Sequence, residues 1–215
     1  MILEKIAAST RKRVEERKKE VPFEKIKAQA EAMETNTGYP FYRALAQEDM
    51  SFICEVKKAS PSKGIIAEKF PYLEIAREYE EAGASAISCL TEPEFFLGKD
   101  QYLKEIAGEV SIPVLRKDFV VDSYQIYEAK TLGASAVLLI CTLLGEENLK
   151  EYLKITRALG MTALTEAHDE EEIRQALRAG ADVIGVNNRN LKNFTVDVEN
   201  SLRLRRYIPE GILFV

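Results

Sequence analysis

The sequence predicts an α/β fold of the (β/α)8 TIM-barrel type, on three observations. An amphipathic helix, a glycine and a short apolar strand follow one another three times, at Gly83, Gly133 and Gly180. The strands are apolar throughout, which is typical of a parallel sheet covered on both faces. Each strand–helix unit spans about 25 residues, as expected for repeated βα modules. An open doubly wound sheet would alternate in the same way, but no G-x-G-x-x-G motif follows the first strand to favour a dinucleotide fold.

Seven strands are predicted, starting near residues 51, 85, 112, 136, 161, 182 and 211. A closed barrel of this type has eight strands, so we expect a barrel that ends within or just after its seventh strand, with the eighth βα unit missing. Such a barrel has two unpaired edges and exposed apolar surface, and self-association through these edges is therefore expected.

Residues 1–47 are expected to form a helical extension that packs on an incomplete barrel of residues 48–215, within a single domain overall. Residues Ile2 to Glu20 predict a charged amphipathic helix with one apolar stripe. A second helix is expected over Glu24 to Met33. Residues Glu34 to Gln47, which include glycine, proline and two aromatic residues, predict a connector.

Six further helices are predicted from amphipathic periodicity. They are expected over Tyr72 to Ala82, Lys99 to Ala107, Ser123 to Leu132, Glu146 to Leu159, Glu170 to Ala179, and Asp197 to Tyr207. Three of them are followed by Gly83, Gly133 or Gly180, at the position where a left-handed residue often terminates a helix.

The composition excludes several classes of protein. A hydrophobic share of 46% with 30% charged residues is typical of a globular protein. The net charge of −5 and the lack of a long basic block argue against nucleic acid as a partner. No apolar run approaches the ~18 residues of a membrane helix, and the N-terminus lacks the apolar core of a signal peptide, so no membrane association is expected.

The cysteines and the histidine indicate the cellular compartment of the protein and whether a metal site is expected. Cys54, Cys89 and Cys141 lie singly in separate apolar runs. This predicts buried, reduced thiols in a cytoplasmic protein. His168 is the only histidine, which argues against a metal site.

Polar residues stand at the ends of five predicted strands, where a parallel barrel carries its catalytic groups. Glu55 and Lys57 lie two positions apart at the first strand end, so their side chains point to the same side. The other four ends carry T-E-P, R-K-D-F, T-E-A-H and N-N-R-N. If the first predicted strand were an edge strand, Glu55 and Lys57 could simply face water, and no functional site would be needed to explain them. Five such ends that converge on one opening predict a functional site.

These residue types supply acid–base chemistry. Glu55, Lys57, Lys117 and Glu166 form a network of alternating charge, whose members shift one another's pKa values. A lysine held among carboxylates stays protonated and acts as a general acid, while a carboxylate opposite serves as the base.

The neighbouring residues predict a polar or anionic ligand with an aromatic part. Asn187 is expected to orient its neighbours by hydrogen bonding, and Arg189 or Lys57 is expected to hold an anion. Phe96 and Phe119 either line the site of an aromatic substrate or pack in the core.

Five motifs occur in the chain in this order: C-E-V-K-K-A-S-P-S-K-G, L-T-E-x-x-F-F-x-G, L-R-K-D-F, L-T-E-A-H and I-G-V-N-N-R-N-L. Together they resemble the indole-3-glycerol phosphate synthase family of tryptophan biosynthesis, from the N-terminal helices to Val215. The resemblance implies a lyase that acts on 1-(2-carboxyphenylamino)-1-deoxyribulose 5-phosphate. This phosphorylated small molecule would be closed into a ring, decarboxylated and dehydrated to indole-3-glycerol phosphate, without cofactor or metal.

The resemblance also implies a role for each catalytic residue. Lys117 would be the general acid that protonates the ketone oxygen as the anthranilate ring attacks. Glu166 would be the base or acid of the later dehydration. Glu55 and Asn187 would order this network, and Lys57 would meet the anionic groups of the substrate.

Substrate contacts are implied for a further set of residues: Ser60, Pro61, Ser62, Phe96, Phe119, Leu138, Arg189 and Leu191. The loop Ser60 to Gly64 would be a mobile cover. In the family, an S-E-S-G-I segment and an eighth strand follow the seventh and hold the phosphate on backbone N–H groups. We expect both to be missing, and therefore expect very low activity unless that piece is supplied in trans.

Two other functions remain open. One is a non-catalytic, incomplete barrel that binds a partner or self-associates. The other is a related phosphate-handling barrel isomerase, in which the four charged residues of the network would have no equally good use.

Overall fold

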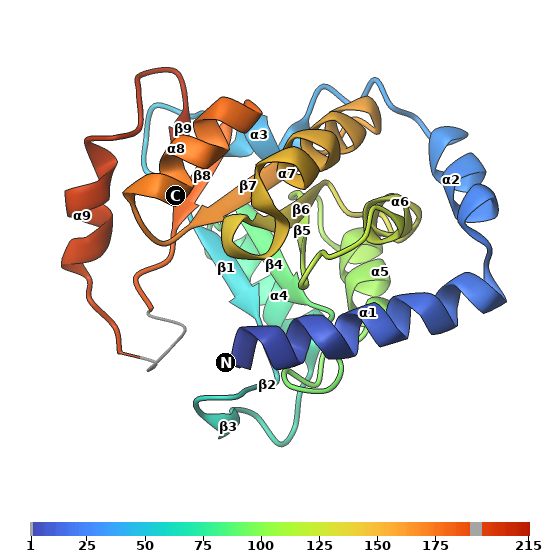
Figure 1. The fold of residues 1–215 in the computed structure, drawn as a ribbon. Helices are drawn as coiled ribbons and strands as arrows, with labels where there is room; N and C mark the ends of the chain where they lie inside the picture. Colours follow the sequence, from blue (N-terminus) through green and yellow to red (C-terminus); the bar gives the residue numbers. More distant parts are fainter. Residues whose placement is uncertain (1, 190–194) are drawn as a thin grey trace.

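Seven parallel strands form one curled sheet in the order β1-β4-β5-β6-β7-β8-β9 (Figure 1). The structure is a computed structural model that describes residues 2–189 and 195–215. The strands are β1 Ile53–Val56, β4 Ala86–Leu90, β5 Val114–Lys117, β6 Ala136–Ile140, β7 Thr162–Ala167, β8 Val183–Val186 and β9 Leu213–Phe214. The predicted count of seven strands and their parallel order are therefore confirmed. Two short strands, β2 Ala59–Ser60 and β3 Gly64–Ile65, pair antiparallel as a separate hairpin.

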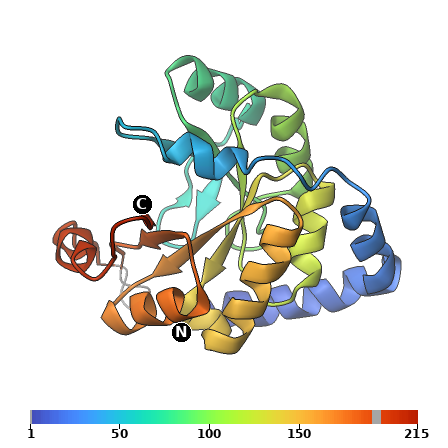
Figure 2. The same ribbon diagram turned by 90° about the horizontal axis from the view of Figure 1, so that it is seen from above.

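Helices connect the strands and cover the outside of the sheet (Figure 2). They are α4 Tyr72–Glu81, α5 Asp100–Glu109, α6 Tyr124–Thr131, α7 Cys141–Ala158, α8 Glu170–Ala179 and α9 Glu199–Arg205. The helix predicted over Glu146 to Leu159 is confirmed as the part of α7 that follows Gly145, whose φ of 67° interrupts the helical backbone, whereas the preceding turn from Cys141 was not predicted. Gly83, Gly133 and Gly180 have φ values of 89°, 89° and 88°, which confirms the left-handed residue expected after each helix.

Three helices precede the first strand: α1 Ile2–Glu20, α2 Phe23–Glu31 and α3 Pro40–Leu45. Helix α1 runs across the carboxyl ends of the strands (Figure 1), and α2 packs on α6. The segment predicted as a connector contains α3, so that prediction was wrong. The proline at the first position of α3 suits a helix start, and Phe41, which is fully buried, packs inside the sheet at its amino end.

Side chains of each strand alternate between two apolar clusters. The cluster inside the curl contains Leu115, Leu138 and Leu164, whereas the cluster between sheet and helices contains Val114 and Val137. Because the period of a strand is two, every second residue faces the interior. The last interior-facing residue of each strand therefore lies at the carboxyl end, where it can reach a common ligand.

The cysteines differ in exposure. Cys89 and Cys141 are buried, and burial raises the pKa of each thiol to about 12. Cys54 is only half-buried, so the prediction of three buried thiols was wrong for this residue, which lies on the edge strand β1. Within residues 2–189 and 195–215, none of the helices has both the length and the apolar character needed to cross a membrane.

Candidate active site

A cavity of about 450 Å³ lies at the carboxyl ends of the strands, between the sheet and the first turns of α1. Its lining contains every site residue predicted from the sequence that lies in the described part of the chain: Glu55, Lys57, Ser60, Pro61, Ser62, Phe96, Lys117, Phe119, Leu138, Glu166, Asn187 and Arg189. Leu191 lies outside the described residues. The cavity volume is within the range of about 300–1,000 Å³ that is usual for small-molecule sites.

Glu55 is the centre of the charge cluster. The Lys57 ammonium group contacts its Oε1 atom, and Nζ of Lys117 lies 3.3 Å from its Oε2 atom. Burial on its own would raise the pKa of the Glu55 carboxyl. The ammonium groups of Lys117 and Lys57 outweigh this effect and hold that pKa below its usual value. Glu55 is therefore an anion that links the two lysines.

At Lys117, burial and the neighbouring charges also act on the pKa in opposite directions. Burial lowers the pKa of its ammonium group, but the carboxylates of Glu55 and Glu166 outweigh burial and raise that pKa above its usual value. Lys117 thus stays protonated at neutral pH. A protonated amine at the end of an interior-facing strand position can donate a proton to a ligand in the cavity.

Glu166 lies on β7, across the cavity from β1. Its Oε1 atom accepts a hydrogen bond of 3.2 Å from Nδ2 of Asn187, and Nε2 of His168 lies 3.4 Å from the same oxygen. The contact with His168 is at ion-pair distance rather than an aligned hydrogen bond. Asn187 therefore orients Glu166.

His168 contacts the site through Glu166, a role that was not predicted from the sequence, where this residue was weighed only as a metal ligand. Its Nδ1 atom lies 2.9 Å from Oε2 of Glu172, which also accepts the backbone N–H of His168 at 2.8 Å. Burial lowers the pKa of the imidazole, but Glu172 and Glu166 outweigh it and raise that pKa. The signal was present in the spacing, because Glu166 and His168 lie two apart and so share one side of the strand.

Apolar residues surround the charged cluster on the other side of the cavity. The rings of Phe96 and Phe119 lie with centroids 5.8 Å apart and planes tilted by 37°. Ile2, Leu3 and Ile6 of α1 also line the cavity. The apolar stripe of α1 was predicted, but its contact with the site was missed, because a stripe does not identify what covers it.

The β2–β3 hairpin carries Ser60, Pro61 and Ser62 over the cavity. The hydroxyl oxygens of Ser60 and Ser62 lie 3.5 Å apart, and the backbone N–H of Lys63 donates to the Ser60 carbonyl at 3.2 Å. Lys63 also lines the cavity and adds a positive charge to this side. The backbone N–H of Arg189 donates to Oδ1 of Asn187 at 2.9 Å, which joins two of the predicted residues.

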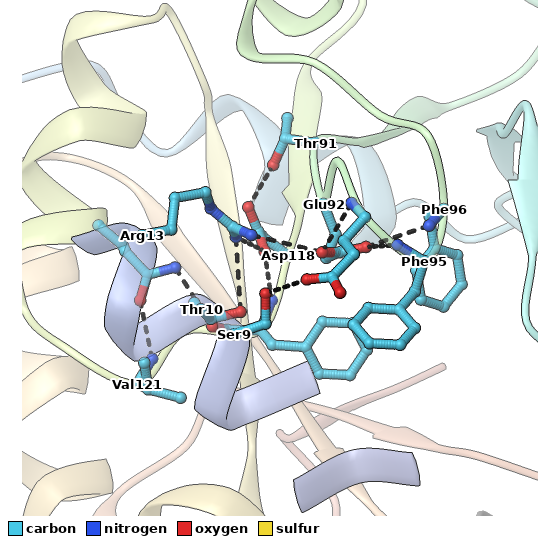
Figure 3. A network of polar contacts seen from close by, with 12 residues as sticks. Ser9, Thr10, Arg13, Thr91, Glu92, Phe95, Phe96, Asp118 and Val121 are labelled. Atoms are coloured by element: carbon cyan, nitrogen blue, oxygen red, sulfur yellow. Dashed lines mark hydrogen bonds and ion pairs between the residues drawn. The ribbon is translucent and has the colours of Figure 1, made fainter. Parts of the chain in front are cut away.

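Six polar residues at the described strand ends do not line the cavity, so the prediction that all five ends converge on one opening was wrong for them: Thr91, Glu92, Arg116, Thr165, His168 and Asn188. Glu92 is buried against Arg13 of α1, and Arg116 is buried on the outer face of the sheet, where it pairs with Asp100 and Glu128. Thr91 donates to Asp118, in the polar network drawn in Figure 3. Arg116 follows an interior-facing residue, and the alternation of the strand places it on the opposite face.

Metal binding has no support in the part of the chain that is described, since no group of three or more His, Cys, Asp or Glu side chains is placed to hold an ion there. The charged cluster instead pairs amines with carboxylates. Such a cluster can exchange protons with a ligand and bind an anionic one.

Comparison with known proteins places these residues in a family. The family model described as indole-3-glycerol phosphate synthase matches residues 3–215. A protein of that description from Ruminiclostridium cellulolyticum is 59% identical over 215 residues, which cover 100% of this chain and 83% of the relative. A second, from Endomicrobium trichonymphae, is 56% identical over the same shares of 100% and 83%.

Two solved structures resemble the fold. The YdjI aldolase from Escherichia coli K12 aligns with a TM-score of 0.52 at 16% identity, over 82% of this chain and 69% of that one. A structure described as native KDPGal aligns with a TM-score of 0.51 at 14% identity, over 78% of this chain and 72% of that one. At these identities the likeness concerns the fold alone, and it confirms the (β/α)8 type, of which seven strands are seen here.

Proposed function

The chain belongs to the indole-3-glycerol phosphate synthase family, and we propose that its acid–base cluster performs the reaction of that family as a carboxy-lyase. The function is that of a lyase in tryptophan biosynthesis with a phosphorylated small-molecule substrate. This membership decides against the alternative of a barrel isomerase. The proposal concerns which residue of the cavity acts at which step on 1-(2-carboxyphenylamino)-1-deoxyribulose 5-phosphate.

Ring closure is assigned to Lys117. The ring carbon that bears the carboxyl group attacks the ketone carbon, and the electron pair of the breaking C=O bond takes a proton from the Lys117 ammonium group. The raised pKa of Lys117 supports this role, because the group is protonated when substrate arrives. The bond to the carboxyl group then breaks, CO₂ leaves, and its electron pair restores the aromatic ring.

Dehydration is assigned to Glu166. The hydroxyl group formed by ring closure leaves as water after it takes a proton, and the adjacent C–H proton is lost as the indole double bond forms. Glu166 is oriented for this transfer by Asn187, at 3.2 Å. Glu55 contacts both Lys57 and Lys117, and Lys57 would meet the anionic groups of the substrate.

Substrate binding is assigned to the remaining lining residues. Phe96, Phe119 and Leu138 would hold the aromatic ring, since all three line the cavity. Ser60, Pro61 and Ser62 would close over the substrate as part of the hairpin, and Arg189 would contact an anionic group. The role of Leu191 stays a prediction from the family resemblance.

The single observation that carries the proposal is that Lys117, Glu55 and Glu166 line one cavity, with Nζ of Lys117 3.3 Å from the Glu55 carboxylate. The test is a single-turnover experiment with enzyme in excess over substrate, which detects slow chemistry as well as fast. We expect indole fluorescence and release of labelled CO₂ from the ring carboxyl group to appear together. Lys117→Met should abolish both, and equal rates for the two proteins would overturn the assignment.

We also propose that the 215-residue chain self-associates through the edges of its sheet. Strands β1 and β9 stand at the two ends of the strand order. Apolar side chains next to these edges are exposed, with Phe52 at 58% and Val215 at 41%. Light scattering should therefore give a mass above that of one chain, whereas a single-chain mass at all concentrations would exclude this.

A further inference from the structure

Arg13 of α1 joins two buried carboxylates that lie in different loops. Its Nη1 atom lies 3.3 Å from Oε1 of Glu92, after β4, and its Nη2 atom lies 3.1 Å from Oδ1 of Asp118, after β5 (Figure 3). Glu92 is 0% exposed and Asp118 is 2% exposed. Two carboxylates withdrawn from water at one place require a cation, because an unpaired buried charge is strongly unfavourable.

Glu92 fixes the loop that carries Phe96. Its carboxylate accepts three backbone hydrogen bonds, from Glu94 at 3.1 Å, Phe95 at 2.7 Å and Phe96 at 3.0 Å. The turn from residue 94 to residue 96 is therefore wrapped around this one side chain. A movement of the Glu92 carboxylate moves the backbone of Phe96.

Asp118 fixes the backbone that carries the second aromatic residue of the cavity. It stands between Lys117 and Phe119 in the chain, and it accepts the backbone N–H of Phe119 at 2.8 Å and the Thr91 hydroxyl at 2.7 Å. Asp118 also lines the cavity. Arg116 is a second cation near it, at 3.6 Å from Oδ2, but that contact is longer than the one with Arg13.

We propose that Arg13 is a positioning residue for the aromatic part of the substrate, a role that rests on the proposed function. It acts through Glu92 and Asp118, and so sets the spacing and tilt of Phe96 and Phe119. The same helix contributes Ile2, Leu3 and Ile6 to the cavity lining. Through Arg13, the position of α1 on the sheet therefore determines how the rings of Phe96 and Phe119 lie relative to each other.

Arg17 provides a matched control on the same helix. It pairs with Asp100 and Glu128, which hold Arg116 on the outside of the sheet and do not line the cavity. Arg17→Met removes one cation and two ion pairs from α1, as Arg13→Met does. A purely structural effect of losing such pairs should appear equally in both variants.

The experiment compares kcat and KM of the wild type, Arg13→Met, Arg17→Met and Arg13→Lys in single-turnover and steady-state assays. We expect Arg13→Met to raise KM and lower kcat/KM about tenfold to a hundredfold, as for a catalytic geometry misplaced by about 1 Å. Arg17→Met should leave KM within about threefold. Arg13→Lys should recover part of the loss, since it retains the charge but not the two-pronged contact.

A role of Arg13 in folding alone predicts a different result, because a smaller folded fraction lowers kcat at an unchanged KM. Equal effects of Arg13→Met and Arg17→Met, or an unchanged KM in Arg13→Met, would overturn the proposal. If Arg13→Met does not fold, Glu92→Gln serves instead, because its amide oxygen can still accept the backbone N–H groups of Phe95 and Phe96, while the acceptor for Glu94 and the negative charge that faces Arg13 are lost. We expect the same rise in KM, and an unchanged KM again overturns the proposal. The outcome is separable from the proposed function, which fails only if Lys117→Met retains full activity.

Discussion

The ammonium nitrogen of Lys117 lies 3.3 Å from the Glu55 carboxylate, and the sequence separation of 62 positions between them is spanned by β1, β4 and β5 of one sheet. Glu55 and Lys57 of the first strand thereby meet the proposed general acid of the third. This contact favours the charged form of the half-buried Lys117 amine, which burial alone would oppose.

The first prediction concerns Glu55→Gln. Glu55 raises the pKa of Lys117, so its removal should lower that pKa. The wild type should keep its kcat/KM to the alkaline end of the measurable range, whereas the variant should lose activity at lower pH. At neutral pH, kcat/KM should fall about tenfold to a hundredfold, as for a perturbed acid–base group. Glu55→Asp is the control that keeps the charge, and a pH profile identical in Glu55→Gln would contradict the prediction.

The second prediction concerns the pKa of His168. The chain has one histidine, so a single imidazole signal can be followed by NMR across pH. Glu172 and Glu166 raise the pKa of this ring against its burial, and Asp169 adds to the effect. We expect titration above the usual value of about 6.5. Glu166→Gln and Glu172→Gln should each lower the midpoint of the His168 titration. A midpoint unchanged in both variants would show that these carboxylates do not raise the pKa of the imidazole.

The same group makes stability depend on pH. A raised pKa in the folded state stabilises the fold fully below the unfolded pKa of about 6.5, and the contribution is lost as pH rises through the folded pKa. The difference in unfolding free energy between the wild type and His168→Gln should therefore be largest in mild acid and shrink towards alkaline pH. Urea unfolding at a series of pH values measures it, and a difference that grows with pH would refute this.

The third prediction compares two glycines. A Cβ atom on Gly98 would lie 2.4 Å from the Leu90 carbonyl oxygen, which is rigid backbone of β4. A Cβ atom on Gly108, within α5, would meet no heavy atom within 4 Å outside its chain neighbours and the backbone of its own helix. We expect Gly98→Ala to destabilise the protein by about 1–3 kcal/mol and Gly108→Ala to stabilise it by about 0.5–1 kcal/mol. Urea unfolding of both variants measures the two free-energy changes. Equal changes in the free energy of unfolding would argue against the contact with the Leu90 carbonyl oxygen.

The fourth prediction concerns thiol reactivity. Burial raises the pKa values of Cys89 and Cys141 to about 12, so few thiolates form at pH 8. Cys54 is half-buried on the edge strand β1. A thiol reagent should modify at most Cys54 in the native protein, and all three cysteines after denaturation. Rapid native modification of Cys54→Ser, which keeps only the two buried thiols, would contradict this.

Much of the site was predictable from local patterns. The period of two places Glu55 with Lys57 and Glu166 with His168 on one side of a strand. The parallel order then brings these pairs to one end of the sheet. Polarity at a strand end does not by itself identify a cavity residue, because the face that the residue occupies also matters: Thr91 and Arg116 alternate with Leu90 and Leu115, which face the interior, and so lie on the opposite face.

The sequence by itself determined the strand–helix alternation, the left-handed glycines after three helices and the acid–base residues, because each depends on neighbours a few positions away. Only the tertiary structure decided what the first helix does. The two carboxylates paired with Arg13 lie 79 and 105 positions further along the chain, and no local pattern identifies partners at that distance. Their pairing follows from the curl of the sheet, which brings two loop carboxylates out of water at one place beneath a helix that carries the cation they need.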